Sequence, residues 1–444
     1  MCEQQRLSFG AVFARVNRLA AALKGIGLEH GDAVAILLPN CIELLDTYRA
    51  CAQLGLVAVP LSPLLRGPGL VTLLRDAGAK LVIAGESVVE ALDEARRELP
   101  QLSSDRCIVV AHDTRSGYAR YDDVVAGSPN EQMEERGISG ADVFNIVYSS
   151  GTTGQPKGIV LTHEVRARYA ALFAAQFRFT PESVVMHAGS LVFNGAFVTL
   201  MPAWLLGCTY ILQERFDPVA FIDTVERERV THVMMVPSQI VALLGAPNFA
   251  REKLASLEML CSVGAPWHRE HKERMLEVLP NALYELYGLT EGFITVLDRE
   301  DFAEHIDSVG TPVPFSRMRI IDKDGREVPP GVVGEITGSS PLMMAGYHGK
   351  PHVTAATIVD GFLHSGDLGT CDADGYLHLV DRKKDMLISG GVNVYPRDIE
   401  EVATRHTAVR EVAVFGISDE RWGETPVAAV ILHSGQSITA LELR

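Results

Sequence analysis

A regular alternation of helical segments and short β-branched runs constrains the fold of this chain more than any other feature. Up to about residue 300, runs rich in Val, Ile and Leu alternate with segments whose apolar residues recur at helical spacing. This order is typical of crossover connections around a parallel sheet. Strands are predicted over 56–59, 80–84, 107–111, 144–148, 231–236 and 257–263, and helices over 42–54, 217–228 and 268–278. The predicted fold class is therefore α/β.

The pattern changes near residue 308. From there to about residue 380, short strands are separated by turn sequences such as Asp324-Gly325 and Asp374-Gly375, which predicts a β-rich subdomain. A charged segment then precedes a strand at 386–388, a helix at 396–405, and strands at 411–415 and 427–432. We expect residues 1–381 to form a large N-terminal domain and residues 382–444 to form part of a small α+β C-terminal domain.

Charge and cysteine usage exclude several classes of protein. The chain of 444 residues has 40 Lys and Arg against 56 Asp and Glu, a formal charge of −16, which argues against a nucleic-acid binder. Its 7 cysteines never form a C-x-x-C pair, which favours a reducing compartment and no zinc ribbon. The N-terminal sequence lacks the apolar run of a secretory signal. We therefore expect a cytoplasmic protein.

One long uncharged segment, residues 188–213, raises the alternative of a membrane span. Asn194, Gly195, Pro202 and Gly207 interrupt this segment. A buried helix, a turn and a core strand explain the pattern better, so we expect no integral membrane span.

Residues 149–158 have the composition of a phosphate-binding loop. The segment reads Ser149, Ser150, Gly151, Thr152, Thr153, Gly154, Gln155, Pro156, Lys157 and Gly158. Its glycines let backbone N–H groups turn towards an anion, its hydroxyls can donate to phosphate oxygens, and Lys157 adds a positive charge. Pro156 and Gly158 around the lysine distinguish it from a Walker A loop. Taken alone, such a composition ordinarily favours a mobile surface loop.

Further motifs accompany the loop. They are Tyr287-Gly288-Leu289-Thr290-Glu291, His364-Ser365-Gly366-Asp367-Leu368-Gly369, and Asp381-Arg382-Lys383-Lys384-Asp385 followed by Ser389-Gly390-Gly391. With these motifs the sequence closely resembles the adenylate-forming superfamily of acyl-CoA synthetases, peptide-synthetase adenylation domains and luciferases. The resemblance covers nearly the whole chain. It implies a large N-terminal domain of two parallel-sheet subdomains and a small β-barrel, followed by a mobile C-terminal domain.

The resemblance also implies a reaction in two steps. A carboxylate attacks the α-phosphate of ATP to give an acyl-adenylate and pyrophosphate, and a thiol, usually that of coenzyme A, then displaces AMP. The implied cofactors are ATP, Mg²⁺ and CoA, and the partner is a small-molecule carboxylic acid. A homodimer is an open alternative.

Nucleotide-binding roles follow from the resemblance motif by motif. Ser150, Thr152, Thr153 and Lys157 would hold the β- and γ-phosphates. Ser149, Gly151 and Gly154 are further predicted cofactor-binding residues. Thr290 would donate to the α-phosphate and Glu291 would ligate Mg²⁺, which makes Lys157, Thr290 and Glu291 the predicted catalytic residues. A solvated turn acid is the alternative for Glu291.

The base and sugar of the nucleotide would meet other segments. Gly264, Ala265, Pro266, Tyr287 and Gly288 would border the adenine, although Val263 stands where many relatives have another glycine. Asp367 would accept from the ribose hydroxyls with Arg382 assisting. Asp367 could instead be only a turn former.

Lys384 would lie at the hinge about which the C-terminal domain rotates, and Gly390 and Gly391 would let the pantetheine pass. An exposed lysine in a charge run is the alternative for Lys384. His268 and His271, one helical turn apart, are surrounded by charged residues and indicate a solvated helix face rather than a metal site.

The family's adenylation lysine lies in a motif near the end of the C-terminal domain, and the sequence stops before any such motif. The start also looks short, because residues 7–23 already resemble a helix that usually follows an N-terminal segment. We therefore expect a truncated or degenerate chain whose adenylation step is severely weakened while nucleotide binding survives.

The acyl pocket is the part of the site that the sequence specifies least. Phe193, within Ser190-Leu191-Val192-Phe193-Asn194-Gly195, replaces the histidine that many relatives carry there. The predicted pocket residues are Phe193, Gly195, Met235, Val236 and Gly288. They favour a hydrophobic, aryl or medium-chain acid, although Phe193 could be plain core. Three functions stay open: an acyl-CoA synthetase, an adenylation domain that loads a carrier protein, and a non-catalytic nucleotide-binding relic.

Overall fold

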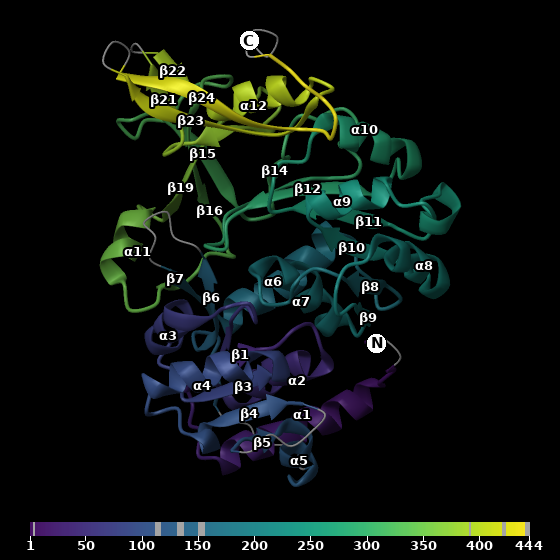
Figure 1. The fold of residues 1–444 in the computed structure, drawn as a ribbon, viewed down its shortest axis with the longest axis vertical. Helices are drawn as coiled ribbons and strands as arrows, with labels where there is room; N and C mark the ends of the chain where they lie inside the picture. Colours follow the sequence, from purple (N-terminus) through teal and green to yellow (C-terminus); the bar gives the residue numbers. More distant parts are fainter. Residues whose placement is uncertain are drawn as a thin grey trace. The chain divides into compact units, whose positions relative to one another are not determined.

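The computed structural model describes residues 1–2, 5–111, 117–130, 137–149, 156–389, 392–419 and 423–439 (Figure 1). The chain divides into two compact units. The first comprises residues 1–306, 313–316 and 340–356, and the second comprises residues 307–312, 317–339 and 357–444. The domain boundary expected between residues 381 and 382 stays a prediction.

An eight-stranded sheet of order β17-β7-β6-β2-β1-β3-β4-β5 opens the first unit. Its strands are β1 (Ala33–Leu37), β2 (Val57–Pro60), β3 (Leu81–Gly85), β4 (Cys107–Val110), β5 (Ala119–Arg120), β6 (Val143–Ser149), β7 (Lys157–Thr162) and β17 (Gly346–Tyr347). Every residue of β1, β2 and β3 is buried, as expected for parallel strands covered on both faces. The covering helices are α1 (Phe9–Gly25), α2 (Ile42–Leu54), α3 (Gly67–Asp76), α4 (Val89–Arg97) and α5 (Tyr121–Ala126), with short helices η1 (Glu86–Val88) and η2 (Ser104–Arg106).

A second sheet of the first unit runs in the order β13-β12-β11-β10-β8-β9. Its strands are β8 (Val184–His187), β9 (Thr209–Leu212), β10 (His232–Met235), β11 (Met259–Val263), β12 (Leu283–Gly288) and β13 (Ile294–Leu297). All neighbours are parallel except β12 and β13. Its helices are α6 (His163–Gln176), η3 (Asn194–Ala196), α7 (Phe197–Leu206), α8 (Pro218–Glu228), α9 (Pro237–Leu244), η4 (Arg251–Leu254) and α10 (Arg269–Val278), and α11 (Pro351–Thr357) follows β17.

The uncharged segment, residues 188–213, adopts the predicted helix, turn and strand. It forms α7, a left-handed turn at Gly207 with φ of 74°, and the strand β9. Within the described ranges, no helix is long and apolar enough to cross a membrane.

The second unit is built from antiparallel strands. One sheet has the order β15-β16-β19-β18, and β20 pairs with β19. Its strands are β15 (Arg317–Ile321), β16 (Gly334–Ser339), β18 (Ile358–Val359), β19 (Phe362–Cys371) and β20 (Leu377–Arg382); β14 (Thr311–Pro312) precedes them. A further sheet of order β22-β21-β24-β23 contains β21 (Leu387–Ser389), β22 (Val392–Val394), β23 (Val409–Asp419) and β24 (Gly423–Leu432), and α12 (Pro396–Thr404) packs on β23.

The predicted fold class is confirmed: two largely parallel sheets precede a β-rich segment and a small antiparallel α+β segment. The expectation of parallel crossovers up to residue 300 needs one correction, because β6 pairs antiparallel with β7, and β12 pairs antiparallel with β13. The spacing of apolar residues predicts which residues are buried, but it does not predict whether two strands pair parallel or antiparallel. Short connections allow a hairpin where a parallel partner would need a longer crossover.

Candidate active site

Three parallel strands of the second sheet end at the same edge. β10, β11 and β12 are followed there by Val236, by residues 264–266 and by residues 289–291. A Cβ added at Gly264, whose φ is 88°, would lie 3.9 Å from Cγ1 of Val236, so neighbouring strand ends are in contact. Ligands of open α/β sheets bind at this edge. The predicted adenine and acyl-pocket residues thus come from adjacent elements.

The side chains at this edge alternate between the core and solvent. Met235 is buried at 2% exposure, whereas the next residue, Val236, is 39% exposed. Residues 264–266 and Gly288 are exposed, and Tyr287 is half-buried. The edge therefore presents an open surface that a flat base or an apolar acid can cover.

The predicted acyl-pocket segment lies against β10. A Cβ added at Gly195 in η3 would lie 3.4 Å from Cε of Met234. Phe193, just before η3, is 59% exposed, which contradicts the alternative that it is a core residue. Phe193 thus keeps a free aromatic face.

Thr290 and Glu291 occupy the turn between β12 and β13. The amide of Leu289 donates to the carbonyl of Phe293 at 3.1 Å, and the amide of Gly292 donates to the carbonyl of Leu289 at 2.9 Å. Gly292 has φ of 113°, and a Cβ there would lie 2.2 Å from the carbonyl oxygen of Leu342. Only glycine fits this position, so the turn that carries the predicted catalytic pair has a fixed course.

The Glu291 carboxylate is anchored by a residue that the sequence analysis missed. The Tyr347 hydroxyl donates to Oε1 of Glu291 at 2.7 Å, and the Met344 amide donates to the Glu291 carbonyl at 2.9 Å. Lys157 Nζ lies 5.0 Å from the centre of the Tyr347 ring. Lys157 and Glu291 are therefore brought to one tyrosine. No motif or spacing rule marks Tyr347, because the contact joins three distant segments.

The phosphate loop itself falls largely outside the described residues. Ser150, Gly151, Thr152, Thr153, Gly154 and Gln155 lie there, as do Gly390 and Gly391 of the later motif. The two flanks of the loop are described: Ser149 ends β6, Lys157 begins β7, and the two residues pair across the antiparallel ladder. The loop thus starts and finishes at neighbouring backbone positions.

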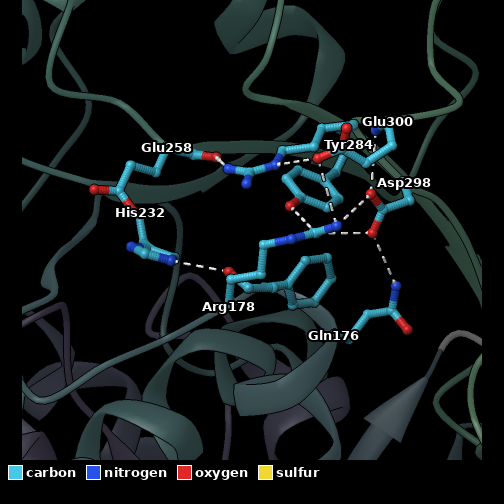
Figure 2. Close-up of polar contacts among 9 residues, drawn as sticks. Gln176, Arg178, His232, Glu258, Tyr284, Asp298 and Glu300 are labelled. Atoms are coloured by element: carbon cyan, nitrogen blue, oxygen red, sulfur yellow. Dashed lines mark hydrogen bonds and ion pairs between the residues drawn. The ribbon is translucent and has the colours of Figure 1, made fainter.

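The opposite end of the β12–β13 hairpin is held by a polar cluster around Arg178 (Figure 2). Arg178 directs its guanidinium group at Asp298, which follows β13, and also donates from Nη1 to the Tyr284 hydroxyl at 2.6 Å. Gln176 Nε2 lies 3.4 Å from Oδ2 of Asp298. His232 Nε2 is 3.0 Å from the carbonyl of Phe177. These contacts join the end of α6 to β10, β12 and β13.

The second unit contains the predicted ribose ligands. Asp367 in β19 and Arg382 in β20 are direct partners across an antiparallel pair, and Arg382 Nε lies 3.7 Å from Oδ1 of Asp367. The Ser365 hydroxyl accepts from the Asp367 amide at 3.0 Å. The predicted hinge residue, Lys384, is half-exposed and lies 3.9 Å from Asp385. The structure thus places Asp367 and Arg382 side by side, and their role as ribose ligands stays a prediction.

The donor set around Glu291 fits Mg²⁺, which prefers hard oxygen ligands and is usually held by one or two carboxylates and substrate phosphates. The hydrogen bond from Tyr347 engages Oε1, so the second carboxylate oxygen can face the ion. Among the described residues, no cluster of three or more His, Cys, Asp or Glu side chains is arranged to hold a metal by protein ligands alone.

Comparison with known proteins identifies the family of the chain. Residues 1–348 match the family model "AMP-binding enzyme", and residues 398–444 match "AMP-binding enzyme C-terminal domain". A feruloyl-CoA synthase from Amycolatopsis is 36% identical over 98% of this chain and 86% of its own length. An indoleacetate–CoA ligase from Aromatoleum aromaticum is 33% identical over 98% of this chain and 85% of its own length.

Solved structures show the same fold. ATP-bound MatB from Rhodopseudomonas palustris superposes with a TM-score of 0.90 at 29% identity, covering 99% of this chain and 86% of that one. The o-succinylbenzoate CoA synthetase MenE from Bacillus subtilis, in complex with its acyl-adenylate intermediate, gives 0.88 at 28% identity, covering 100% and 86%. The chain therefore belongs to the AMP-binding enzyme family, within the adenylate-forming superfamily, and its relatives are acid–thiol ligases.

Proposed function

We propose that the protein activates a hydrophobic carboxylic acid, of the aryl or medium-chain class, with ATP and transfers the acyl group to coenzyme A. The observation that carries this proposal is the convergence of Lys157 and Glu291 on Tyr347, in the unit whose strand ends carry Val236 and Gly288. A cytoplasmic location belongs to the same proposal.

The first step joins two anions. An oxygen of the substrate carboxylate forms a bond to the α-phosphorus of ATP while the bond to the pyrophosphate oxygen breaks. The ammonium of Lys157 would offset charge on the departing phosphates, and the hydroxyl of Thr290 would donate to an α-phosphate oxygen. Glu291 would hold Mg²⁺, which would supply further charge neutralisation.

Other residues would orient the substrates. Asp367 and Arg382 would accept from and donate to the ribose hydroxyls, and Tyr287 would pack on the adenine. In the second step the thiol sulfur of CoA bonds to the acyl carbon, the thiol proton is released to solvent, and AMP leaves with the bonding electron pair. Lys384 would serve as a hinge position between the two steps.

Apolar groups around the predicted acyl site support the acid class. Phe193 and Val236 expose hydrophobic surface, and Met235, which precedes Val236 in the chain, is buried. The names of relatives point the same way: feruloyl-CoA synthase, indoleacetate–CoA ligase, and a medium/long-chain-fatty-acid–CoA ligase from Mycobacterium tuberculosis that is 32% identical. A fatty acid–acyl-carrier-protein ligase from Streptomyces coeruleorubidus, 30% identical over the full chain, supports a carrier-protein acceptor as the second candidate.

A panel of acids tests the proposal. We would incubate the protein with ATP, Mg²⁺ and one acid, chosen from a hydroxycinnamate, indoleacetate, octanoate, acetate and malonate, and measure pyrophosphate release. Thioester formation would then be followed by mass spectrometry with CoA or with a holo carrier protein. We expect aryl or medium-chain acids to give the highest pyrophosphate release, and CoA to give the thioester. Preference for acetate or malonate, or no adenylate with any acid, would overturn the proposal.

A further inference from the structure

We propose that Tyr347 is a positioning residue for adenylation: its hydroxyl orients the Glu291 carboxylate for the metal ion, and its ring supports the Lys157 ammonium. The inference rests on the proposed function and names a residue outside the sequence motifs of the site.

The contact with Glu291 is a hydrogen bond between a phenol and a carboxylate. The bond is 2.7 Å long and partly buried, and Tyr347 is only 6% exposed, which limits competition from water. Hydrogen bonds to ionised groups are roughly twice as strong as neutral ones. The bond fixes Oε1, and with it the direction in which the other carboxylate oxygen points.

The contact with Lys157 uses the ring. Nζ lies 5.0 Å from the ring centre, within the range in which an ammonium is attracted to the face of an aromatic ring. Lys157 belongs to the part of the phosphate loop that the structure describes, directly after Pro156. The ring therefore limits where a flexible four-carbon side chain can carry its charge.

Tyr347 is itself held on a rigid support. β17 pairs antiparallel with β7, with Tyr347 opposite Ile159. The amide of His348 donates to the Gly158 carbonyl at 2.7 Å, and the amide of Ala345 donates to the Val160 carbonyl at 2.9 Å. On the other side, the Met344 amide holds the Glu291 carbonyl. The same short segment therefore ties down the backbones of both β7 and the Glu291 turn.

Backbone pairing cannot by itself orient a carboxylate at the end of a glutamate side chain. Without the phenol hydroxyl, Glu291 could rotate about its terminal torsion, which is broad in energy. The metal would then meet a less organised ligand. We expect removal of the hydroxyl to weaken metal binding to the nucleotide complex about tenfold, the effect of losing one hydrogen bond to a charged group.

The experiment compares Tyr347→Phe with Tyr347→Leu. Tyr347→Phe removes the hydroxyl and keeps the ring, whereas Tyr347→Leu removes both. Tyr118→Phe is the matched control, because Tyr118 also donates to a carboxylate, that of Asp93, at a site remote from the Glu291 turn in the sequence and outside the predicted site. Binding of Mn²⁺ to the ATP complex, measured by electron paramagnetic resonance, and calorimetry of ATP over a series of Mg²⁺ concentrations give readouts independent of turnover.

For Tyr347→Phe we expect about a tenfold rise in the half-saturating metal concentration with unchanged metal-free ATP affinity. For Tyr347→Leu we expect the same rise together with weaker metal-free ATP binding. Metal dependence of Tyr347→Phe equal to that of Tyr118→Phe would overturn the inference. Melting temperatures show whether each variant is folded. If one of the two Tyr347 variants is unfolded, the metal dependence of the other is compared with that of Tyr118→Phe.

Glu291→Gln separates this inference from the proposed function. If Glu291→Gln weakens metal binding and Tyr347→Phe does not, only the role of Tyr347 is refuted. If neither substitution changes the metal dependence, the assignment of Glu291 as the metal ligand fails as well.

Discussion

Arg178 contacts Asp298 through both terminal nitrogens of its guanidinium group, with Nη1 at 2.9 Å from Oδ2 and Nη2 at 3.0 Å from Oδ1. Arg178 follows α6 with a left-handed φ of 58°, and Asp298 follows β13. The pair thus fastens the end of a helix to the base of the hairpin whose tip carries Glu291. The hydrogen bond to Asp298 raises the pKa of Arg178, and this effect outweighs burial, which lowers it.

We expect a double-mutant cycle of Arg178→Met and Asp298→Asn to give a coupling energy of about 1 kcal/mol in urea unfolding. The bidentate geometry strengthens the pair, and partial exposure of Arg178 weakens it by solvent screening. Arg269 and Glu273, an exposed pair within α10, provide the control, with an expected coupling of about 0.3–0.5 kcal/mol. Equal coupling energies for the two pairs would show that the Arg178–Asp298 pair stabilises the fold no more than an exposed ion pair does.

Gly292→Ala is expected to destabilise the protein by more than about 3 kcal/mol, because the added methyl group would collide with the backbone of Leu342 at a positive φ. Gly325→Ala is the matched control: Gly325 also has a positive φ, of 78°, but no atom lies within 4 Å of the added Cβ. That control should lose only about 1 kcal/mol. Thermal unfolding of both variants measures the difference, and similar losses would refute the proposed clash.

Arg166 is a buried cation in α6 whose hydrogen-bond acceptor is an amide. Its Nε and Nη2 donate to Oδ1 of Asn145 at 3.2 and 3.1 Å, and the guanidinium lies 3.9 Å from the centre of the Phe197 ring. Burial lowers the pKa of Arg166 to about 10. Within the described part of the chain, no carboxylate lies at ion-pair distance from it.

Asn145→Ala should therefore cost about 2–3 kcal/mol, since it leaves a buried charge without its acceptor. The double variant Asn145→Leu with Arg166→Met should be close to wild type in stability, because apolar side chains of similar volume avoid the cost of desolvation. Guanidinium chloride unfolding of both variants tests this contrast. A double variant less stable than Asn145→Ala would contradict it.

The pH dependence of stability should reveal His232. Burial, opposed by the hydrogen bond to the Phe177 carbonyl, lowers the pKa of His232 to about 4. An unfolded histidine has a pKa of about 6.5, so between these values the unfolded chain binds a proton that the folded protein does not. The free energy of unfolding must then fall as the pH drops from about 6.5 to 4, by at most about 3 kcal/mol for this group. His232→Gln should reduce the slope over that window without abolishing it, because burial also lowers the pKa of His187 to about 4. An unchanged slope would exclude His232 as a contributor.

The strand positions could be predicted because they depend on local sequence patterns. Strands such as β10 and β11 fall within one or two residues of their predicted ranges, because burial on both faces gives them continuous apolar runs. The four motifs identified the positions of Thr290, Glu291, Asp367 and Arg382. Their arrangement depended on contacts that no window of sequence contains.

The features that escaped prediction are non-local. The antiparallel pairing of β17 with β7 joins residues nearly two hundred positions apart, and the Tyr347 contacts follow from it. Arg166 lies among polar residues at the start of a helix, where the pattern gives no sign of complete burial. Burial of such a residue is decided by which element packs over it.

At the end of β10, burial changes between two adjacent residues. Met235 is sealed into the sheet, whereas the Val236 side chain reaches outward beside Gly264. If Val236 borders the acid as proposed, a substitution at this exposed position would change the space available to the acid while the buried Met235 stays packed in the sheet.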